Sequence, residues 1–266
     1  MATFHERLAA ARAAYPLPFE LRELAEAFGR GLLEFLFPQF ARSRHASPAD
    51  LAAEEARLRH LLASAQTDPA SVDRFFSELP GIYDALLADA DAIYQGDPAA
   101  TSRDEVILAY PGFFAIALYR PAHALQVLGA PLFPRLLTEF AHRQTGIDIH
   151  PAAQIGARFA IDHGTGIVIG ETAVLGDRVK LYQGVTLGAA SVRKTLSQTK
   201  RHPTIGNNVV IYAHATILGG DTVVGDDSVI GGNVWLTHSV PPNSMITHRE
   251  HERRERPAED LVEFHL

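Results

Sequence analysis

Hydrophobic residues recur at every third or fourth position through the first 140 residues of the chain. This spacing places apolar side chains on one face of a helix, so it predicts amphipathic α-helices. Ser47 before Pro48 is typical of a helix start, and Pro80 predicts a kink or break in the helix around it. We expect an all-helical domain over residues 1–142 whose apolar stripes form the core. The stripes comprise Leu21, Leu24, Ala25, Phe28, Leu32, Phe35 and Leu36; Leu51, Leu58 and Leu62; and Val72, Phe75, Phe76, Leu79, Ile82, Leu86 and Leu87, with further helices over 111–119 and 134–142.

From about residue 147 the hydrophobic period changes to six. Neither the helical period nor the strand period produces this spacing, whereas a six-residue repeat is typical of a parallel β-helix built from hexapeptides. Each inward aliphatic side chain would contribute roughly 1.5–3 kcal/mol by burial. The first series is Ile149, Ile155, Ile161, Ile167, Ala173, Val179 and Val185. The second is Ile169, Leu175, Leu181 and Leu187, resuming at Ile205, Ile211 and Ile217 and, after a slip of one residue, at Val224, Ile230 and Leu236.

Two segments lack the repeat. Residues 188–204 carry Arg193 and Thr199 where the second series requires aliphatic residues, so they predict an inserted loop. Residues 245–266 are highly charged and predict a C-terminal tail. The expected class is therefore α + β: a helical N-terminal domain over 1–142, a β-helix over 143–244 with the loop 188–204, and the tail. Because a coil with three six-residue sides takes eighteen residues, residues about that far apart should lie on adjacent coils.

The charge and amino-acid composition of the chain exclude several classes of function. The net charge of −7 argues against a general nucleic-acid surface. The chain has no cysteine, which excludes disulfides, thiolate metal ligands and a cysteinyl acyl-enzyme. The N-terminal residues lack the continuous apolar stretch of a signal peptide, and the most apolar segment, 113–133, contains Arg120 and two prolines, so it is a poor membrane span. We expect a soluble, cytoplasmic protein.

Several motifs resemble those of serine acetyltransferases. DIHP at 148–151 is followed by DHGTGIVIGETA at 162–173, VTLG at 185–188 and RHP at 201–203, in the family's order, and DPA at 97–99 also matches. Single hexapeptides specify only the fold, whereas this combination is specific to the family. The resemblance implies a left-handed β-helix. It also implies transfer of an acetyl group from acetyl-CoA to the hydroxyl of L-serine, which gives O-acetyl-L-serine and CoA in cysteine biosynthesis.

His163 is the candidate general base. Acetyl transfer to a hydroxyl needs a group that accepts its proton, and histidine suits this with an ordinary pKa near 6.5. On the six-residue count His163 falls on the second series, whose other members are aliphatic. Asp148 lies fifteen residues earlier, so it could approach from an adjacent coil, fix the imidazole tautomer and stabilise the imidazolium. The family resemblance implies the same two roles. From spacing alone, a structural histidine–aspartate pair is the favoured alternative.

The resemblance also implies residues that hold the amino acid. Asp97 and Asp162, one from each half of the chain, would bind the ammonium group of serine. Arg201, in the inserted loop, would bind the carboxylate through two parallel hydrogen bonds, and His202 would add another. The alternatives are a turn residue before Pro98 for Asp97, and a solvated loop for Arg201 and His202.

Acetyl-CoA is implied as a co-substrate, and no metal is implied. Relatives hold the coenzyme in a groove between the β-helices of neighbouring subunits, where Gly188 and Ala213 occupy matching positions. This chain has Tyr212 and His214 where many relatives carry glycine, and residues 243–247 replace the usual G-V-P-A segment. The contacts of the adenine end are therefore open, and Arg253-Arg254 is more typical of a solvated charged face.

The resemblance further implies a homotrimer or a dimer of trimers. In the family the C-terminus often inserts into O-acetylserine sulfhydrylase; here the chain ends in Leu266, and binding of that partner by the tail stays open. Cysteine is expected to inhibit at the serine site. No membrane or nucleic-acid partner is expected.

Three other functions remain. Another hexapeptide acyltransferase acting on a different hydroxyl or on an amine would keep His163 but would not need the ammonium and carboxylate binders. A non-catalytic regulatory partner of the sulfhydrylase would bind through the tail without turnover. A metal hydratase on the same fold would need three histidines facing one another, and the spacing of the histidines at 163, 202, 214 and 238 does not favour it.

Overall fold

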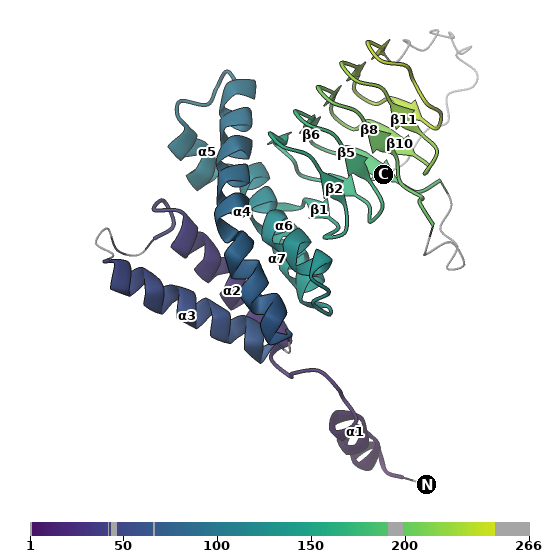
Figure 1. Cartoon of the computed structure of the whole chain (residues 1–266). Coiled ribbons are helices and arrows are strands. Elements are labelled where there is room, and N and C mark those ends of the chain that lie inside the picture. The colour runs from purple at the N-terminus through teal and green to yellow at the C-terminus, as the bar shows by residue number, and fades with distance from the viewer. Residues whose placement is uncertain (1, 42, 44–46, 66, 191–198, 248–266) are drawn as a thin grey trace, which may run out of the picture.

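The chain folds into a helical domain followed by a stack of short parallel strands (Figure 1). The computed structural model describes residues 2–247 apart from residues 42, 44–46, 66 and 191–198. The architecture is the predicted one, an N-terminal helical domain and then a left-handed parallel β-helix. The helices of the described residues are α1 (Phe4–Ala13), α2 (Leu21–Leu36), α3 (Pro48–Ser64), α4 (Pro69–Gly96), α5 (Arg103–Ala109), α6 (Pro111–Val127) and α7 (Phe133–Thr145).

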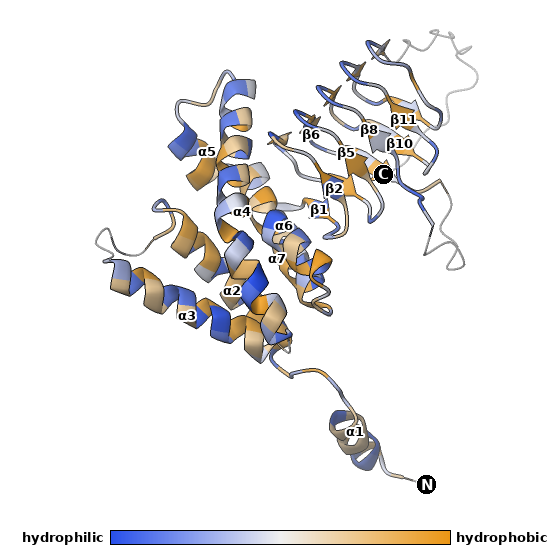
Figure 2. Cartoon of the chain, viewed as in Figure 1, coloured by the Kyte–Doolittle hydropathy of each residue, from blue (hydrophilic) through white to orange (hydrophobic). Residues whose placement is uncertain are grey.

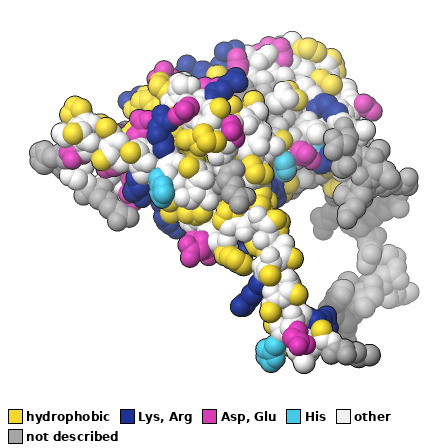
Figure 3. Space-filling model, turned by 60° about the horizontal axis from the view of Figure 1, so that its bottom comes forward, with side chains coloured by type: hydrophobic (Ala, Val, Ile, Leu, Met, Phe, Trp, Pro, Cys, Tyr) yellow, Lys and Arg dark blue, Asp and Glu magenta, His cyan; other side chains and the backbone are white. Residues whose placement is uncertain are grey.

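Aromatic side chains hold the helical domain together. Phe28 of α2 meets Phe133 of α7 edge-on, with ring centroids 5.6 Å apart, and Phe37 meets Phe113 of α6 at 5.4 Å. Edge-to-face geometry is the arrangement that the ring quadrupoles favour. α4 passes through Pro80 without the predicted break, because Pro80 lies on the exposed side of the helix, where solvent can satisfy the carbonyl that loses its partner. α1 buries no residue and stands clear of the other labelled helices in Figure 1; Figure 3 shows the described surface from below.

Fourteen short strands form the three sides of the β-helix in the described residues. From β1 to β13 successive strands go to successive sides, so each sheet contains every third strand; β14 then joins the third sheet directly. The strands of the first sheet, sheet A, are β1 (Asp148–Ile149), β4 (Val168–Ile169), β7 (Thr186–Gly188), β10 (Thr216–Leu218) and β13 (Trp235–Leu236). Sheet B contains β2 (Gln154–Ile155), β5 (Val174–Leu175), β8 (Thr204–Ile205) and β11 (Val223–Val224). Sheet C contains β3 (Ala160–Asp162), β6 (Lys180–Tyr182), β9 (Val210–Ile211), β12 (Val229–Ile230) and β14 (Met245–Ile246).

The coils differ in length, which corrects the prediction of eighteen residues for each. Paired residues on sheet A show this: Asp148 pairs with Val168, 20 positions later, whereas Val168 pairs with Thr186, 18 positions later. The two additional residues lie at the corner between β3 and β4. The next coil contains the inserted loop, and Thr216 then pairs with Trp235, 19 positions later, which explains the slip of one residue in the second series.

The additional corner residues also change the meaning of the first hydrophobic series. Ile161 pairs with Leu181 across adjacent coils, so it belongs to the same inward position as the second series. Ile167, six residues after Ile161, is instead the buried corner residue that precedes β4. The unbroken six-residue spacing therefore joins two structural positions. Figure 2 shows the result, with hydrophobic residues along the strands and hydrophilic residues at the corners.

A buried ion pair joins the two halves of the chain. The guanidinium of Arg120 in α6 donates to both carboxylate oxygens of Asp89 in α4, at 2.8 and 2.9 Å, and to the carbonyls of Ile155 and Gly156 in the first coil, both at 2.7 Å. Asp89 also accepts the backbone N–H of Phe159 at 2.8 Å. The helical domain is thereby fixed to the first coil. None of the helices in the described part of the chain combines the length and the apolar character that crossing a bilayer requires.

Candidate functional site

His163 lies in the widened corner between β3 and β4. Its backbone adopts a left-handed conformation, with φ of 57°, and its side chain is 72% exposed. This corrects the position on an inward-facing series that the six-residue count implied, because the two additional residues carry the corner outward. Gly164 follows with φ of 97°, and a Cβ there would lie 2.5 Å from Cδ1 of Ile147, so a larger residue would strain the backbone and force its neighbours to move. The corner therefore presents an imidazole on a tightly constrained turn.

Asp162, beside His163, is paired with a lysine that no sequence motif indicates. The Nζ atom of Lys180, in the next coil of sheet C, lies 2.9 Å from Oδ2 of Asp162, and both side chains are about 15% exposed or less. Oδ1 of Asp162 lies 3.8 Å from Nε2 of His163. Lys180 stands eighteen residues after Asp162, so the predicted coil length was a signal that could have found it.

Asp97 reaches the same corner from the helical domain. It caps the C-terminus of α4, and it accepts hydrogen bonds from the hydroxyl of Tyr110 at 2.7 Å and from the N–H of Ala99 at 2.8 Å. These bonds, with the nearby charges of Lys180 and His163, lower the pKa of Asp97 below its ordinary value. The same hydrogen bond raises the pKa of Tyr110 to about 12. Asp97 is thus an ionised carboxylate at neutral pH.

Lys180 connects these two carboxylates. Besides pairing with Asp162, its ammonium donates to the carbonyl of Gly96, the residue before Asp97, at 2.7 Å. The structure therefore brings three predicted site residues together, Asp97, Asp162 and His163, although they come from both halves of the chain. We call this group, with Lys180 and Tyr110, the His163 corner.

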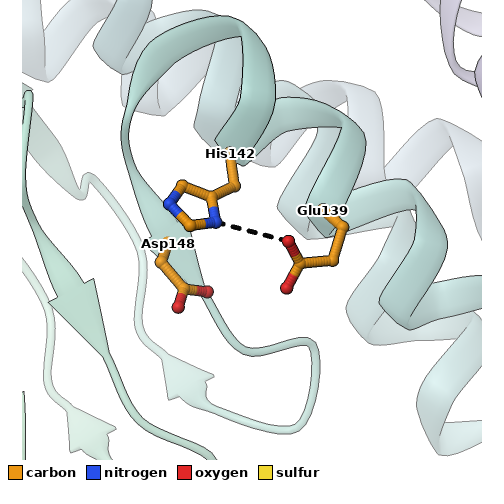
Figure 4. A group of neighbouring side chains, drawn as sticks. All are labelled: Glu139, His142 and Asp148. Carbon is orange, nitrogen blue, oxygen red and sulfur yellow. Dashed lines mark hydrogen bonds and ion pairs between the residues drawn. The ribbon is translucent and has the colours of Figure 1, made fainter.

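Asp148 starts sheet A, and its backbone N–H bonds to the carbonyl of Ile167 at the end of the widened corner. Its side chain points to α7, and Oδ1 of Asp148 lies 3.8 Å from the guanidinium of Arg135 in that helix. Figure 4 shows Asp148 beside Glu139 and His142. The Nδ1 atom of His142 lies 3.3 Å from Oε2 of Glu139. Among the residues that the structure describes, the carboxylate within ion-pair distance of His163 is that of Asp162, so the predicted Asp148–His163 contact stays a prediction.

Glu139, His142 and Asp148 have ligand atoms within 4.8 Å of one another, a spacing that suits a metal ion. Arg135, however, forms ion pairs with both carboxylates of this group. A guanidinium in that place repels a cation and already neutralises the acidic side chains, so the arrangement is that of an ion-pair network.

Arg201 and His202 lie at a different edge of the β-helix, the corner between sheets A and B. Arg201 is paired with the carboxylate of Glu171. His202 is 8% exposed, and its Nδ1 accepts the backbone N–H of Thr172 at 3.0 Å and lies 2.9 Å from the hydroxyl of that residue. Burial, reinforced by the positive charge of Arg201, lowers the pKa of His202 to about 4. A single chain therefore does not bring this pair to the His163 corner.

The two predicted coenzyme-binding positions lie on sheet A and at the corner between sheets C and A. Gly188 ends β7, and Ala213 follows β9, where its carbonyl accepts the N–H of Asn233 at 2.9 Å. Tyr212, next to Ala213, stacks on Tyr182 with centroids 4.9 Å apart and planes 12° apart. Tyr182 lies one coil beyond Asp162, with which it pairs in register, and Tyr212 lies on the coil after that.

Some sequence-based expectations concern other parts of the chain. Arg193, the dibasic Arg253-Arg254 and the terminal Leu266 lie outside the described residues. Lys180, Tyr110, Thr172 and Glu171 were missed as site residues; Glu171 and Thr172 belong to the GETA part of the family-like motif, but no spacing rule connected them with Arg201, thirty positions away.

Comparison with known proteins gives a consistent result. No family model matches the chain. A plasmid-encoded serine acetyltransferase of Synechococcus elongatus is 51% identical over 178 residues, which cover 65% of this chain and 56% of that relative. The serine acetyltransferase of Mycobacterium tuberculosis is 47% identical over 162 residues, covering 61% of this chain and 69% of that protein. The chain thus spans little more than half the length of the Synechococcus relative.

A solved structure extends the likeness to the whole fold. Serine acetyltransferase 1 of Entamoeba histolytica, in complex with L-cysteine, superposes with a TM-score of 0.76 at 36% identity, covering 85% of this chain and 86% of that one. Both the helical domain and the β-helix are therefore shared. On this similarity of sequence and fold, the chain belongs to the serine acetyltransferase family.

Proposed function

We propose that the chain is a serine O-acetyltransferase, which transfers the acetyl group of acetyl-CoA to the hydroxyl of L-serine. The observation that carries the proposal is the His163 corner, where an exposed imidazole stands beside two carboxylates, Asp162 and Asp97, from different halves of the chain. A hydroxyl compound with an ammonium group fits this corner, because the carboxylates attract the ammonium while the imidazole accepts the hydroxyl proton.

The acetyl group passes directly from acetyl-CoA to serine, without an acyl-enzyme. His163 takes the proton of the serine hydroxyl as the oxygen attacks the thioester carbonyl carbon, which forms a tetrahedral intermediate. The intermediate collapses by breaking the carbon–sulfur bond, and the imidazolium returns its proton to the departing thiolate. The products are O-acetyl-L-serine and CoA. Asp148 is the proposed group that orients the imidazole and stabilises its charged form; for this role it must exchange its ion pair with Arg135 for a bond to His163.

Arg201 and His202 are the proposed binders of the serine carboxylate. Because they lie at another edge of the β-helix, the complete site requires the neighbouring subunit of a trimer, whose Arg201 edge faces the His163 corner. Acetyl-CoA then lies in the groove between the two β-helices, past Gly188 and Ala213. The L-cysteine complex of the Entamoeba histolytica relative supports cysteine as an inhibitor at the serine site.

Release of free thiol from acetyl-CoA tests the reaction. Purified protein is given L-serine, D-serine, homoserine or glucosamine in parallel. We expect L-serine to be preferred and His163→Asn to lower kcat by about 10²–10⁴-fold, the usual contribution of a general base. His60→Asn, on exposed α3, is the matched control and should behave as the parent protein. Equal rates with glucosamine would favour another hexapeptide acyltransferase and would refute the serine assignment.

A second experiment tests the shared site. His163→Asn and Arg201→Ala subunits, each inactive alone, are co-expressed with different tags and purified together. If one site combines His163 of one subunit with Arg201 of the next, mixed trimers contain some sites with both residues intact, and activity returns. If both residues serve a site within one chain, every site in the mixture lacks one of them, and no activity returns.

A further inference from the structure

We propose that Thr172 is a positioning residue whose hydroxyl holds both Arg201 and His202 in place, and that it thereby presents His202 as a neutral ring with its proton on Nε2. This inference deepens the proposed function, since it concerns the edge that would bind the substrate carboxylate. Thr172 itself touches no substrate in this proposal. It acts through the two residues that follow the inserted loop.

The hydrogen bonds at Nδ1 of His202 determine the tautomer. The backbone N–H of Thr172 lies 3.0 Å from Nδ1, and an N–H group can only donate. The Nδ1 atom must therefore accept, which leaves the single ring proton on Nε2. The hydroxyl of Thr172 lies 2.9 Å from the same nitrogen.

The hydroxyl of Thr172 has no other orientation available. Its oxygen accepts the backbone N–H of Arg201 at 2.9 Å and the backbone N–H of His202 at 3.1 Å, which occupies both acceptor positions. Its own hydrogen is then directed to Nδ1 of His202, where it shares the single ring lone pair with the backbone N–H of Thr172. One side chain thus satisfies two amides and one ring nitrogen, and it fixes the backbone of the chain where it returns from the inserted loop.

The packing around the ring supports the same reading. A Cβ at Gly170 would lie 2.0 Å from Cδ2 and 2.1 Å from Nε2 of His202, so the ring rests directly on a glycine of the neighbouring coil. Lys200 donates to the carbonyls of Thr172, at 2.8 Å, and of His202, at 3.0 Å, which clamps the same turn. The ring is therefore held by Thr172 and Gly170, and Lys200 holds the backbone that carries it.

The charges facing His202 favour a neutral ring. Arg201, Lys200 and His150 oppose a second proton, while Glu171 is the acidic group on that side and is already paired with Arg201. Burial is the largest cause that lowers the pKa of His202. A ring in this state offers one donor and no positive charge. It suits a carboxylate or carbonyl oxygen beside the guanidinium of Arg201, and it disfavours an ammonium group.

Histidine side-chain NMR of the full-length protein tests the inference without any turnover. The His202 signals are identified by their loss in His202→Gln. In the parent protein and in Thr172→Ser we expect the pattern of a single Nε2–H tautomer that does not titrate above about pH 5, as the pKa near 4 requires. Thr172→Val keeps the backbone N–H but removes the acceptor of the Arg201 and His202 amides. The turn that carries the ring should then move away from the N–H of Thr172, and we expect mixed tautomers or titration at higher pH. A Thr172→Val spectrum identical to the parent's would overturn the proposal.

Kinetics gives the second measurement. Thr172→Val should raise KM for L-serine about ten-fold while KM for acetyl-CoA stays within two-fold, and Thr172→Ser should restore most of the loss, as expected when one buried hydrogen-bond network is broken. Thr222→Val is the matched control: Thr222 lies at the same edge on the next coil, and its hydroxyl bonds the carbonyl of Leu218 in its own corner. Equal effects of both valine substitutions would contradict a specific role. Should the parent protein fail to acetylate serine, the proposed function falls, and the NMR result still decides this inference.

Discussion

The ammonium of Lys180 lies 2.9 Å from the carboxylate of Asp162, and its second hydrogen bond goes to the carbonyl next to Asp97. A cation of the protein therefore already stands between the two carboxylates that are proposed to bind the ammonium of serine. Asp97 does not depend on it, since Tyr110 and Ala99 hold that side chain separately. Lys180 consequently reduces the negative charge that a substrate meets.

Replacing Lys180 by methionine should strengthen serine binding. The change leaves two unneutralised carboxylates at the corner, so KM for L-serine should fall about three-fold or more, the size of effect that one partly exposed ion pair produces. Initial rates over a range of serine concentrations measure it. Arg178→Met is the matched control, because it removes the same charge at a corner between sheets B and C. A rise in KM would instead show that Lys180 mainly supports the end of α4.

Tyr110→Phe should change the acid side of the pH profile. The Tyr110 hydrogen bond is the largest cause of the low pKa of Asp97, so its loss should raise that pKa. Asp97 then becomes protonated, and loses its attraction for an ammonium, at a higher pH than in the parent. We expect kcat/KM for serine to decline earlier as pH falls, with little change near pH 8. Tyr94→Phe, on the exposed surface of α4, serves as control. If kcat/KM of Tyr110→Phe and of the parent protein fell identically at low pH, Tyr110 would have no role in keeping Asp97 ionised.

Arg120→Met should destabilise the whole protein. Asp89 is fully buried, and the change leaves its carboxylate without a cationic partner, with the backbone N–H groups of Phe159 and Arg158 as donors. Breaking one side of a buried pair costs about 3–5 kcal/mol. The thermal unfolding midpoint should therefore fall by roughly 6–20 °C, at about 2–4 °C per kcal/mol for a chain of this size.

The double variant Asp89→Asn/Arg120→Met provides the check on that interpretation. It removes the uncompensated charge, so it should recover part of the lost stability. Arg103→Met, which breaks the exposed pair with Asp91, should shift the midpoint by no more than about 2 °C. A double variant less stable than Arg120→Met would show that packing, and not charge burial, dominates this joint.

Gly164→Ala should displace His163. The substitution places a Cβ 2.5 Å from Ile147 at a residue with φ of 97°, so the corner must move. We expect kcat to fall about ten-fold or more, since small displacements of a catalytic group are costly. Gly166→Ala shares the left-handed backbone, with φ of 83°, but its nearest contact is 3.5 Å away. Thiol-release assays of both variants separate the effect of the Ile147 contact from that of backbone strain. Equal rates for the two variants would argue against a role for the contact.

The hydrophobic pattern was sufficient for the architecture. A three- to four-residue period and then a six-residue period require, respectively, amphipathic helices and a triangular coil, and the structure has both. Of the residues selected for chemistry, Asp97, Asp162 and His163 meet at one corner. Residues such as Lys180 and Tyr110 were missed because ordinary lysines and tyrosines carry no motif, and only their neighbours in space give them a role.

The sequence by itself determined the order of the two domains, the inward-facing ladder and the family-like motifs, because periodicity and composition act locally along the chain. Only the tertiary structure decided where those motifs point. The corner at His163 has two additional residues, which turn the imidazole outward. The sequence does not reveal them, because Ile161 and Ile167 are still six residues apart although they occupy different structural positions. The distance between edges likewise depends on how coils of different length stack, so the placement of Arg201 and His202 away from His163 followed from the fold alone.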